Sequence, residues 1–346
     1  MTIRWGILGC GDVTEVKSGP ALQLATDSSV VAVMRRTGAL AEDYAKRHQV
    51  ARWYDSADEL FHDPEVNAIY IATPPGSHLA YALQAAEIGK PAYVEKPMAR
   101  NFRECQQMVE AFQGRDLPLF VAYYRRALPR FLKVKEIIDS GILGTITGVQ
   151  HRLEAPVPAD FDTQTLPWRL VAPHSGGGLF FDLGSHALDL IDYLLGPLEN
   201  VAGMASNGAA LYDVEDTVVM HFRTGSGVLG LASWNFASSN TRDIVEIVGL
   251  KGSLRFAVFA QEPVCLRVDD QLKHFEIPHP PHVQQPLIQC VVNDLLGRGT
   301  CPSTGETAAR TAAVMDQVVT NYYGDRKHDF WDAPDSWPGL KSWPQQ

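Results

Sequence analysis

The segment from Ser175 to Gly196 combines a run of glycines with side chains that can exchange protons. Asp182, His186 and Asp189 follow one another there at i, i+4 and i+7. Wound as a helix at about 100° per residue, these three side chains fall in one stripe. An acid and an imidazole on one face can transfer protons, share a divalent ion or form a solvated ion pair. Taken alone, the stripe favours a solvated face, because polar stripes on half-buried helices are common.

The other side of the same segment is apolar and carries Leu183, Ala187, Leu190, Ile191 and Leu194. This spacing predicts an amphipathic helix that packs its apolar side on a core and ends its polar stripe at Tyr193. A metal site is the sharpest alternative for the polar stripe. The stripe holds a single histidine, whereas zinc usually takes more nitrogen or sulfur ligands, so we predict no metal.

A glycine-rich turn lies near the N-terminus, in the sequence IRWGILGCGDVTE. Gly9 and Gly11 follow an apolar run typical of a buried strand, and Asp12 and Val13 begin a helical pattern. The first glycine allows a tight turn, and the second lets a pyrophosphate approach the backbone at a helix N-terminus. Thr14 stands where the usual motif has a third glycine, which loosens helix packing more than phosphate contact. The turn predicts a dinucleotide site.

Two arginines, Arg35 and Arg36, follow the second apolar strand, VVAVM. Enzymes that use NAD usually place an aspartate or glutamate there, against the adenosine ribose. Arginine can bind a 2′-phosphate through two hydrogen bonds, so the pair predicts that NADP(H) is favoured over NAD(H). The alternative is a pair of solvated loop arginines.

A lysine follows a further apolar strand, in the sequence PAYVEKPMA, where Lys96 stands between Glu95 and Pro97. Ligands of open α/β sheets bind beyond the carboxyl ends of the strands, so this ammonium is placed to reach the nicotinamide end of a cofactor. Pro97 restricts the backbone of Lys96 to extended conformations. A functional lysine and a surface ion pair are the two hypotheses for this position.

Short apolar runs alternate with helical patterns through the first third of the chain. This alternation predicts strands joined by helical crossovers, and hence a doubly wound parallel sheet of the Rossmann type with helices on both faces. After residue 122 the pattern changes to alternating strands with hairpin signals, which predict an antiparallel sheet. We predict a dinucleotide-binding domain over residues 1–122, an α+β domain over 123–330 and an irregular tail over 331–346.

The composition of the 346-residue chain limits the functions that fit it. Lys and Arg total 30 against 40 Asp and Glu, and a net charge of −10 gives no footprint for nucleic acid or an anionic membrane. The five cysteines are scattered and form no CxxC pair, which indicates a reducing compartment without structural zinc. No apolar run is long enough for a signal peptide or a membrane span, so we predict a soluble, cytoplasmic protein.

Together these separated motifs resemble the glucose–fructose oxidoreductase, inositol dehydrogenase and MocA family (Gfo/Idh/MocA). The resemblance covers nearly the whole chain and is carried by GILGCGDV, ATPPGSH, EKP, GILGTI, SGGGLFFDLGSHALDL and GLKGSL. It implies a Rossmann domain followed by an α+β domain with a large open, mostly antiparallel sheet. It also implies an NAD(P)-dependent dehydrogenase or reductase that acts on a hydroxyl or keto carbon of a sugar, polyol or related diol.

The resemblance implies roles for individual residues. Lys96, Asp182 and His186 match catalytic positions that also contact the substrate, and Tyr124 joins them more weakly, from a variable segment. With the glycine turn and the arginine pair included, the predicted cofactor site comprises Gly9, Gly11, Asp12, Val13, Arg35, Arg36, Thr73, Pro74, His78, Glu95, Lys96, Trp168 and Arg169. A homodimer or homotetramer through the open sheet is implied by the resemblance alone.

Hydride transfer requires a proton to leave or join the substrate oxygen. An imidazole titrates near neutral pH, so His186 suits acid–base work, while the ammonium of Lys96 suits an electrostatic and proton-sharing role at the oxygen. Asp182 can accept from a second hydroxyl or orient the imidazole. Whether Lys96 or His186 moves the proton stays open, with His186 slightly favoured, and the substrate and the direction of reaction stay open too.

Two other functions fit the same motifs. An enzyme can hold NAD tightly and use it for a transient oxidation with no net redox change. A catalytically silent sugar sensor can keep the NAD(P)-binding fold, although it has little need of Lys96, Asp182 and His186 together.

Overall fold

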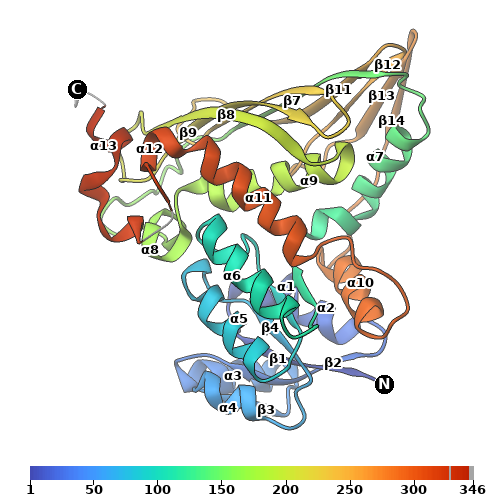
Figure 1. Ribbon diagram of the computed structural model, residues 1–346. Helices are drawn as coiled ribbons and strands as arrows, with labels where there is room; N and C mark the ends of the chain where they lie inside the picture. The colour runs from blue at the N-terminus through green and yellow to red at the C-terminus, as the bar shows by residue number, and fades with distance from the viewer. Residues whose placement is uncertain (327–328, 343–346) are drawn as a thin grey trace. The chain divides into compact units, whose positions relative to one another are not determined.

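The computed structural model describes residues 1–326 and 329–342, which form two compact units. Unit 1 comprises Met1–Ala99, Arg103–Leu128 and His279–Ala309. Unit 2 comprises Arg100–Phe102, Pro129–Pro278 and the described residues from Arg310 onward. Each unit is built on its own β-sheet, with the elements labelled as in Figure 1.

Unit 1 is built on a six-stranded sheet in the order β3-β2-β1-β4-β5-β6. Its strands are β1 (Ile3–Leu8), β2 (Ser28–Met34), β3 (Arg52–Tyr54), β4 (Ala68–Ile71), β5 (Ala92–Val94) and β6 (Leu119–Val121). Adjacent strands all pair in parallel, which confirms the predicted doubly wound sheet. The strand order reverses between β1 and β4, the place where such sheets bind ligands beyond the carboxyl ends of their strands.

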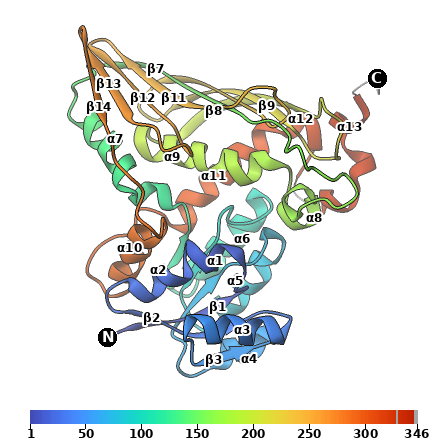
Figure 2. The same cartoon turned by 180° about the vertical axis from the view of Figure 1, so that it is seen from behind.

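Helices cover both faces of this sheet. They include α1 (Asp12–Val16), α2 (Gly19–Leu24), α3 (Gly38–His48), α4 (Ala57–His62), α5 (His78–Glu87), α6 (Phe102–Gln113) and α10 (Gln285–Leu295). Figures 1 and 2 show α5 and α6 on one face and α1 and α3 on the other. This follows from right-handed crossovers, because the strand order extends from β1 in two opposite directions.

A late segment, His279–Ala309, belongs to unit 1. Ser303 hydrogen-bonds the Val121 backbone of β6, with its Oγ 2.7 Å from the Val121 carbonyl oxygen. Gln289 of α10 accepts from the Thr26 backbone N–H at 2.8 Å. Unit 1 therefore includes a late segment that lies outside the predicted limits of the first domain, 1–122, and inside those of the second, 123–330. The sequence did not predict this, because contacts between distant segments leave no local pattern. As domain limits, those boundaries stay a prediction.

Unit 2 is built on an eight-stranded sheet in the order β14-β13-β12-β11-β7-β10-β9-β8. Its strands are β7 (Ile146–Glu154), β8 (Leu198–Ser206), β9 (Thr217–Thr224), β10 (Leu229–Asn235), β11 (Arg242–Gly249), β12 (Gly252–Phe256), β13 (Val264–Val268) and β14 (Gln271–Phe275). Neighbouring strands are antiparallel except for β7 and β10, which confirms the large, mostly antiparallel sheet.

One face of the unit 2 sheet is covered by helices, among them α7 (Pro129–Asp139), α9 (Ser185–Leu195) and α11 (Gly305–Val318). In β9, Val218, Met220 and Phe222 point into this core and are buried. The alternate residues point to the opposite face, where Val219 is 48% exposed and Leu231 of β10 is 58% exposed. The sheet thus presents one open face that carries apolar side chains.

The C-terminal tail contains short helical turns, whereas the sequence predicts an irregular segment over residues 331–346. They are Phe330–Asp332, Pro334–Ser336 and α13 (Pro338–Ser342). Trp337 fixes them: it is buried, its ring centroid lies 4.7 Å from that of Tyr323, and its indole N–H donates to the Phe330 carbonyl oxygen at 2.8 Å. Residues 343–346 lie outside the described residues. None of the helices in the described part of the chain is long and apolar enough to cross a membrane.

Candidate active site

The glycine turn of unit 1 has the backbone that a phosphate loop needs. Gly9 has φ +87°, and a Cβ at this position would lie 2.6 Å from Cγ2 of Thr73, so only glycine fits. A Cβ at Gly11 would meet only the Gly9 carbonyl oxygen, at 3.9 Å, which leaves that side of the backbone open to a ligand. Asp12 and Val13 begin α1 directly after the turn. The turn therefore fits a dinucleotide phosphate.

Thr14, at the position of the missing third glycine, is fully buried and tightly held. Its Oγ1 donates to the Gly11 carbonyl oxygen at 2.7 Å, and its own carbonyl accepts from the Tyr44 hydroxyl at 2.9 Å. The close approach that the third glycine usually provides is found at Gly19 instead, where a Cβ would lie 2.2 Å from the Thr14 carbonyl oxygen. The helix after the turn is thus fixed by other residues.

The arginine pair follows β2 on the surface of unit 1. Both side chains are exposed, and Nη1 of Arg35 lies 3.4 Å from the carbonyl oxygen of Cys10, inside the glycine turn. Arg35 therefore extends over the turn. Arg36 is placed beside it as the next residue.

The loop after β4 carries three of the predicted cofactor residues. Thr73 Oγ1 accepts from the Ser77 hydroxyl at 2.7 Å, and Pro74 is exposed. His78 is fully buried, with ring nitrogens 2.6 Å from the Thr73 carbonyl oxygen and 3.1 Å from that of Met98. Burial lowers the pKa of His78, which favours a neutral ring. His78 thus ties the β4 loop to the loop that carries Lys96.

Glu95 and Lys96 follow β5, and the peptide bond between Lys96 and Pro97 is cis, which the sequence did not predict. Glu95 is buried, and its Oε2 accepts from the backbone N–H of Lys96 at 3.2 Å. Its Oε1 accepts from the Tyr70 hydroxyl at 2.7 Å and from Nε2 of Gln284 at 2.6 Å. Glu95 is therefore an internal anchor for the backbone of Lys96.

Tyr124 begins a short 3-10 helix, Tyr124–Ala127, just beyond β6. Its side chain is 9% exposed, and the guanidinium carbon of Arg125 lies 5.0 Å from its ring centroid. Tyr124 is therefore largely buried, and a substrate contact at this position stays a prediction.

In unit 2, a π-helical turn over Phe180–Gly184 precedes α9 and carries Asp182. The predicted helix is confirmed as α9, with Ala187, Leu190, Ile191 and Leu194 buried, but its polar stripe is not a solvated face. His186 is 3% exposed and Asp189 is 1% exposed, while Leu183, predicted to anchor the helix, is only half-buried. The wide turn changes the angle between Asp182 and His186. The structure thus excludes the solvated face.

Asp182 pairs with Arg169, which follows Trp168 in a short 3-10 helix over Trp168–Leu170. Nε of Arg169 donates to Oδ2 of Asp182 at 2.9 Å, and its guanidinium carbon lies 4.5 Å from the centroid of the Trp168 ring. The structure therefore brings together two predicted motifs that are separate in the sequence. The side chain of Arg169 is 46% exposed, so the cluster is accessible from solvent.

His186 packs edge-on against Phe259, with ring centroids 5.9 Å apart and an angle of 78° between the planes. Phe259 stands in a loop that Asp243 holds through three backbone N–H groups, those of Val258, Phe259 and Ala260, at 2.9, 2.6 and 2.9 Å. Asp243 thus fixes the aromatic wall beside His186. Nothing in the local sequence around Asp243 identifies this role, since its partners lie in the loop after the next strand.

The glycine run before Asp182 is held by a buried glutamate, Glu215. Its two carboxyl oxygens lie 3.0 and 2.9 Å from the backbone N–H of Gly178, and the hydroxyl of Tyr323 donates to it. A Cβ at Gly178 would lie 2.4 Å from the Glu215 carbonyl oxygen, so the two segments pack backbone to backbone. Burial raises the pKa of Glu215 to about 7.

The raised pKa of Glu215 gives the stability of the protein a defined pH dependence. The folded-state pKa lies above the unfolded value, so the folded state binds more protons between about pH 4.5 and 7. Stability from this group is present at low pH and is lost as the pH rises through 7. As the pH rises, the wild type should lose about 2 to 4 kcal/mol of its free energy of unfolding through this group. The Glu215→Gln variant, which has no carboxyl group to titrate, should not show this loss. Thermal unfolding midpoints of both proteins from pH 5 to 9 test this, and parallel pH curves would contradict it.

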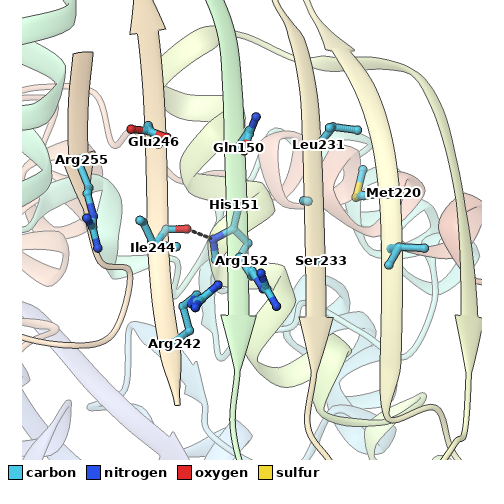
Figure 3. Close-up of a pocket in the computed structure, with 12 residues that line it drawn as sticks. Gln150, His151, Arg152, Met220, Leu231, Ser233, Arg242, Ile244, Glu246 and Arg255 are labelled. Carbon is cyan, nitrogen blue, oxygen red and sulfur yellow. Dashed lines mark hydrogen bonds between the residues drawn. The ribbon is translucent and has the colours of Figure 1, made fainter. Parts of the chain in front are cut away.

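A hollow of about 580 Å³ lies on the open face of the unit 2 sheet. Figure 3 shows arginines of three strands, Arg152, Arg242 and Arg255, around it, with Leu231 and Glu246. Arg152 pairs with Glu154 on the same strand, so part of this charge is already balanced. The hollow contains none of the predicted site residues.

The doubly wound sheet, with a glycine turn at its switch point, defines a dinucleotide-binding protein. Residues 3–123 match the family model described as oxidoreductase family, NAD-binding Rossmann fold, and residues 131–255 match the GFO/IDH/MocA C-terminal domain. The chain belongs to the Gfo/Idh/MocA family of oxidoreductases, as its motifs predicted.

Its relatives include enzymes named for redox reactions. It is 37% identical over 317 residues to oxidoreductase P35 of Formosa agariphila, covering 91% of this chain and 97% of that protein. It is 27% identical over 323 residues to 1,5-anhydro-D-fructose reductase of Ensifer adhaerens, covering 91% and 95%. The structure of levoglucosan dehydrogenase in complex with NADH has the same fold, with a TM-score of 0.81, 22% identity and coverage of 92% and 96%.

Proposed function

We propose that this oxidoreductase transfers a hydride between NADP(H) and a hydroxyl or keto carbon of a sugar, polyol or related diol. The observation that carries the proposal is the anchored Glu95–Lys96 segment at the carboxyl end of β5, in the same unit as the phosphate loop. A relative named 1,5-anhydro-D-fructose reductase supports the substrate class.

In the proposed reaction, the protein binds the substrate and manages the proton that accompanies the hydride. Lys96 stabilises the negative charge that develops on the reacting oxygen, as an ammonium does in a site that excludes water. His186 takes or gives the proton. Asp182, fixed by Arg169, accepts from a second hydroxyl of the substrate. The nicotinamide, when bound, supplies or accepts the hydride.

The residues around the glycine turn hold the cofactor in this proposal. Gly9 and Gly11 let the pyrophosphate approach the backbone, and Arg35 and Arg36 bind the 2′-phosphate. We propose further cofactor contacts from Asp12 and Val13 and from the loop that carries Thr73, Pro74 and His78. Trp168 and Arg169 are proposed to contact the cofactor as well.

Replacing both arginines with alanine tests the cofactor preference. We expect kcat/KM for NADP to fall about 10- to 100-fold, because each arginine that contacts a phosphate contributes charge-assisted hydrogen bonds. The value for NAD should change by less than about twofold, since NAD lacks the added phosphate. The matched control is Arg115→Ala, on the exposed surface after α6. A wild-type preference of about tenfold for NAD would contradict the assignment.

A screen of sugars, polyols and diols with NADP and with NAD tests the function itself. Absorbance of the reduced nicotinamide should change in proportion to the substrate consumed. A cofactor that stays bound and never exchanges, with a product at the same oxidation level, would favour transient oxidation instead. Ligand binding without turnover would favour a sensor.

The proposal also covers the oligomeric state and the cellular location of the enzyme. Exposed apolar side chains such as Val219 and Leu231 on the open sheet face support a homodimer or homotetramer through that face, which the molar mass in solution tests. The scattered cysteines support a cytoplasmic location.

A further inference from the structure

A chain of buried hydrogen bonds in unit 1 ends at the backbone of Lys96. Gln284 is 0% exposed and directly precedes α10, in the late segment that completes unit 1. Its Nε2 donates to Oε1 of Glu95 at 2.6 Å, and Oε2 of Glu95 accepts from the Lys96 backbone N–H at 3.2 Å. A single carboxylate therefore connects Gln284 with the lysine.

The orientation of the Gln284 amide is set by Tyr93 on β5. The Tyr93 hydroxyl donates to Oε1 of Gln284 at 2.9 Å. Burial raises the pKa of Tyr93 well above its ordinary value, so the phenol keeps its proton. Because the amide oxygen accepts from Tyr93, the amide NH₂ group faces Glu95.

Tyr70 on β4 provides a second donor to the same carboxylate oxygen, at 2.7 Å. Burial also raises the pKa of Tyr70 well above its ordinary value, so it too acts as a donor. Its hydroxyl lies 2.9 Å from Oγ of Ser18, between α1 and α2. Glu95 is thus held from two sides in a low-dielectric interior, where the loss of one partner weakens the whole network.

We propose that Gln284 is a positioning residue for the reaction, which acts by holding Glu95 and thereby the backbone from which the Lys96 side chain starts. The inference rests on the proposed function, because that function places the ammonium of Lys96 at the reacting oxygen. Small displacements of a catalytic group cost large factors in rate. Gln284 itself touches neither substrate nor cofactor in this account.

The variant Gln284→Met keeps the volume of the side chain and removes both hydrogen bonds. We expect kcat to fall about tenfold while the dissociation constant for NADPH stays within about twofold of wild type. The matched control is Gln289→Met, in the helix α10 that follows Gln284, whose amide contacts Thr26 and Asn293. In a Glu95→Gln background, Gln284→Met should lower kcat by less than about twofold more, because the connection is already broken.

A second readout needs no substrate. Competitive labelling with acetic anhydride, followed by peptide mass spectrometry, gives the reactivity of the Lys96 amine relative to the exposed Lys17. We expect Gln284→Met to change this ratio about threefold or more and Gln289→Met to leave it unchanged. An unchanged ratio together with an unchanged kcat would overturn the inference.

The two proposals fail in different ways. If wild-type protein turns over no sugar, polyol or diol, but Gln284→Met still changes the labelling of Lys96, the proposed function fails and the positioning role stands. If Gln284→Met does not fold, Tyr93→Phe takes its place, because it releases the amide and keeps the ring. It should change the same ratio by about threefold or more, and no change would then overturn the inference.

Discussion

Replacing Lys96 with alanine lowers kcat by about 100- to 1000-fold, the usual cost of removing one group that stabilises a developing oxyanion. The dissociation constant for NADPH should stay within about threefold of wild type, because the glycine turn and the arginine pair are untouched. Steady-state kinetics and fluorescence titration of NADPH measure the two effects separately.

Two further variants make the Lys96 test specific. Lys96→Arg keeps the positive charge and should recover part of the lost rate, although a planar guanidinium does not match a compact ammonium. Lys46→Ala removes an exposed lysine of α3 that pairs with Glu42 and should leave kcat unchanged. Loss of NADPH binding with an intact kcat in Lys96→Ala would assign the lysine to the cofactor alone.

Replacing His186 lowers kcat by about 100- to 10,000-fold if this imidazole carries the proton. We choose His186→Gln, since the side chain is buried against Phe259 and alanine would leave a cavity. The pH profile of kcat/KM should lose the limb that reports the proton carrier, which a purely structural change would not remove.

The control for His186 is His221→Gln, on an exposed position of β9 in the same unit. It should leave the rate and the pH profile unchanged. If His186→Gln keeps both kcat and the wild-type pH profile, the proton is carried by another group, and Lys96 becomes the first candidate.

The fold was predictable because its signals are local. Apolar runs between helical patterns specify the six parallel strands, and turn residues such as the Asp269–Asp270 pair mark the hairpins of unit 2. The Gly9 turn was predictable for the same reason, since its tight backbone needs glycine within one short stretch. Local sequence signals were therefore sufficient to predict the architecture and the phosphate loop.

The environment of α9 was not predictable from its own periodicity. The pattern indicated one solvated stripe, but His186 packs against Phe259 of a distant loop, and Asp189 is 1% exposed. A helix enclosed by other elements can keep polar residues if each finds a partner. The π-helical turn before α9, which moves Asp182 relative to His186, also leaves no periodic signal.

Long-range hydrogen bonds account for the rest of what the sequence could not predict. Gln284 meets Glu95 across 189 residues of chain, and Tyr70 is one hydroxyl within the apolar run AIYIA. Asp243 likewise acts through a loop that lies beyond the next strand. Such residues have ordinary types in ordinary surroundings, so only the folded structure identifies them.

Direct transfer of the hydride is the central claim, and an isotope measurement tests it most directly. A polyol or diol substrate labelled with deuterium at its carbinol carbon is incubated with NADP, and the free reduced cofactor is analysed by mass spectrometry. Direct transfer predicts one deuterium in each reduced cofactor and an equal amount of oxidised product. Deuterium retained in a product at the substrate's oxidation level, or released to water, with none in free cofactor, would contradict it.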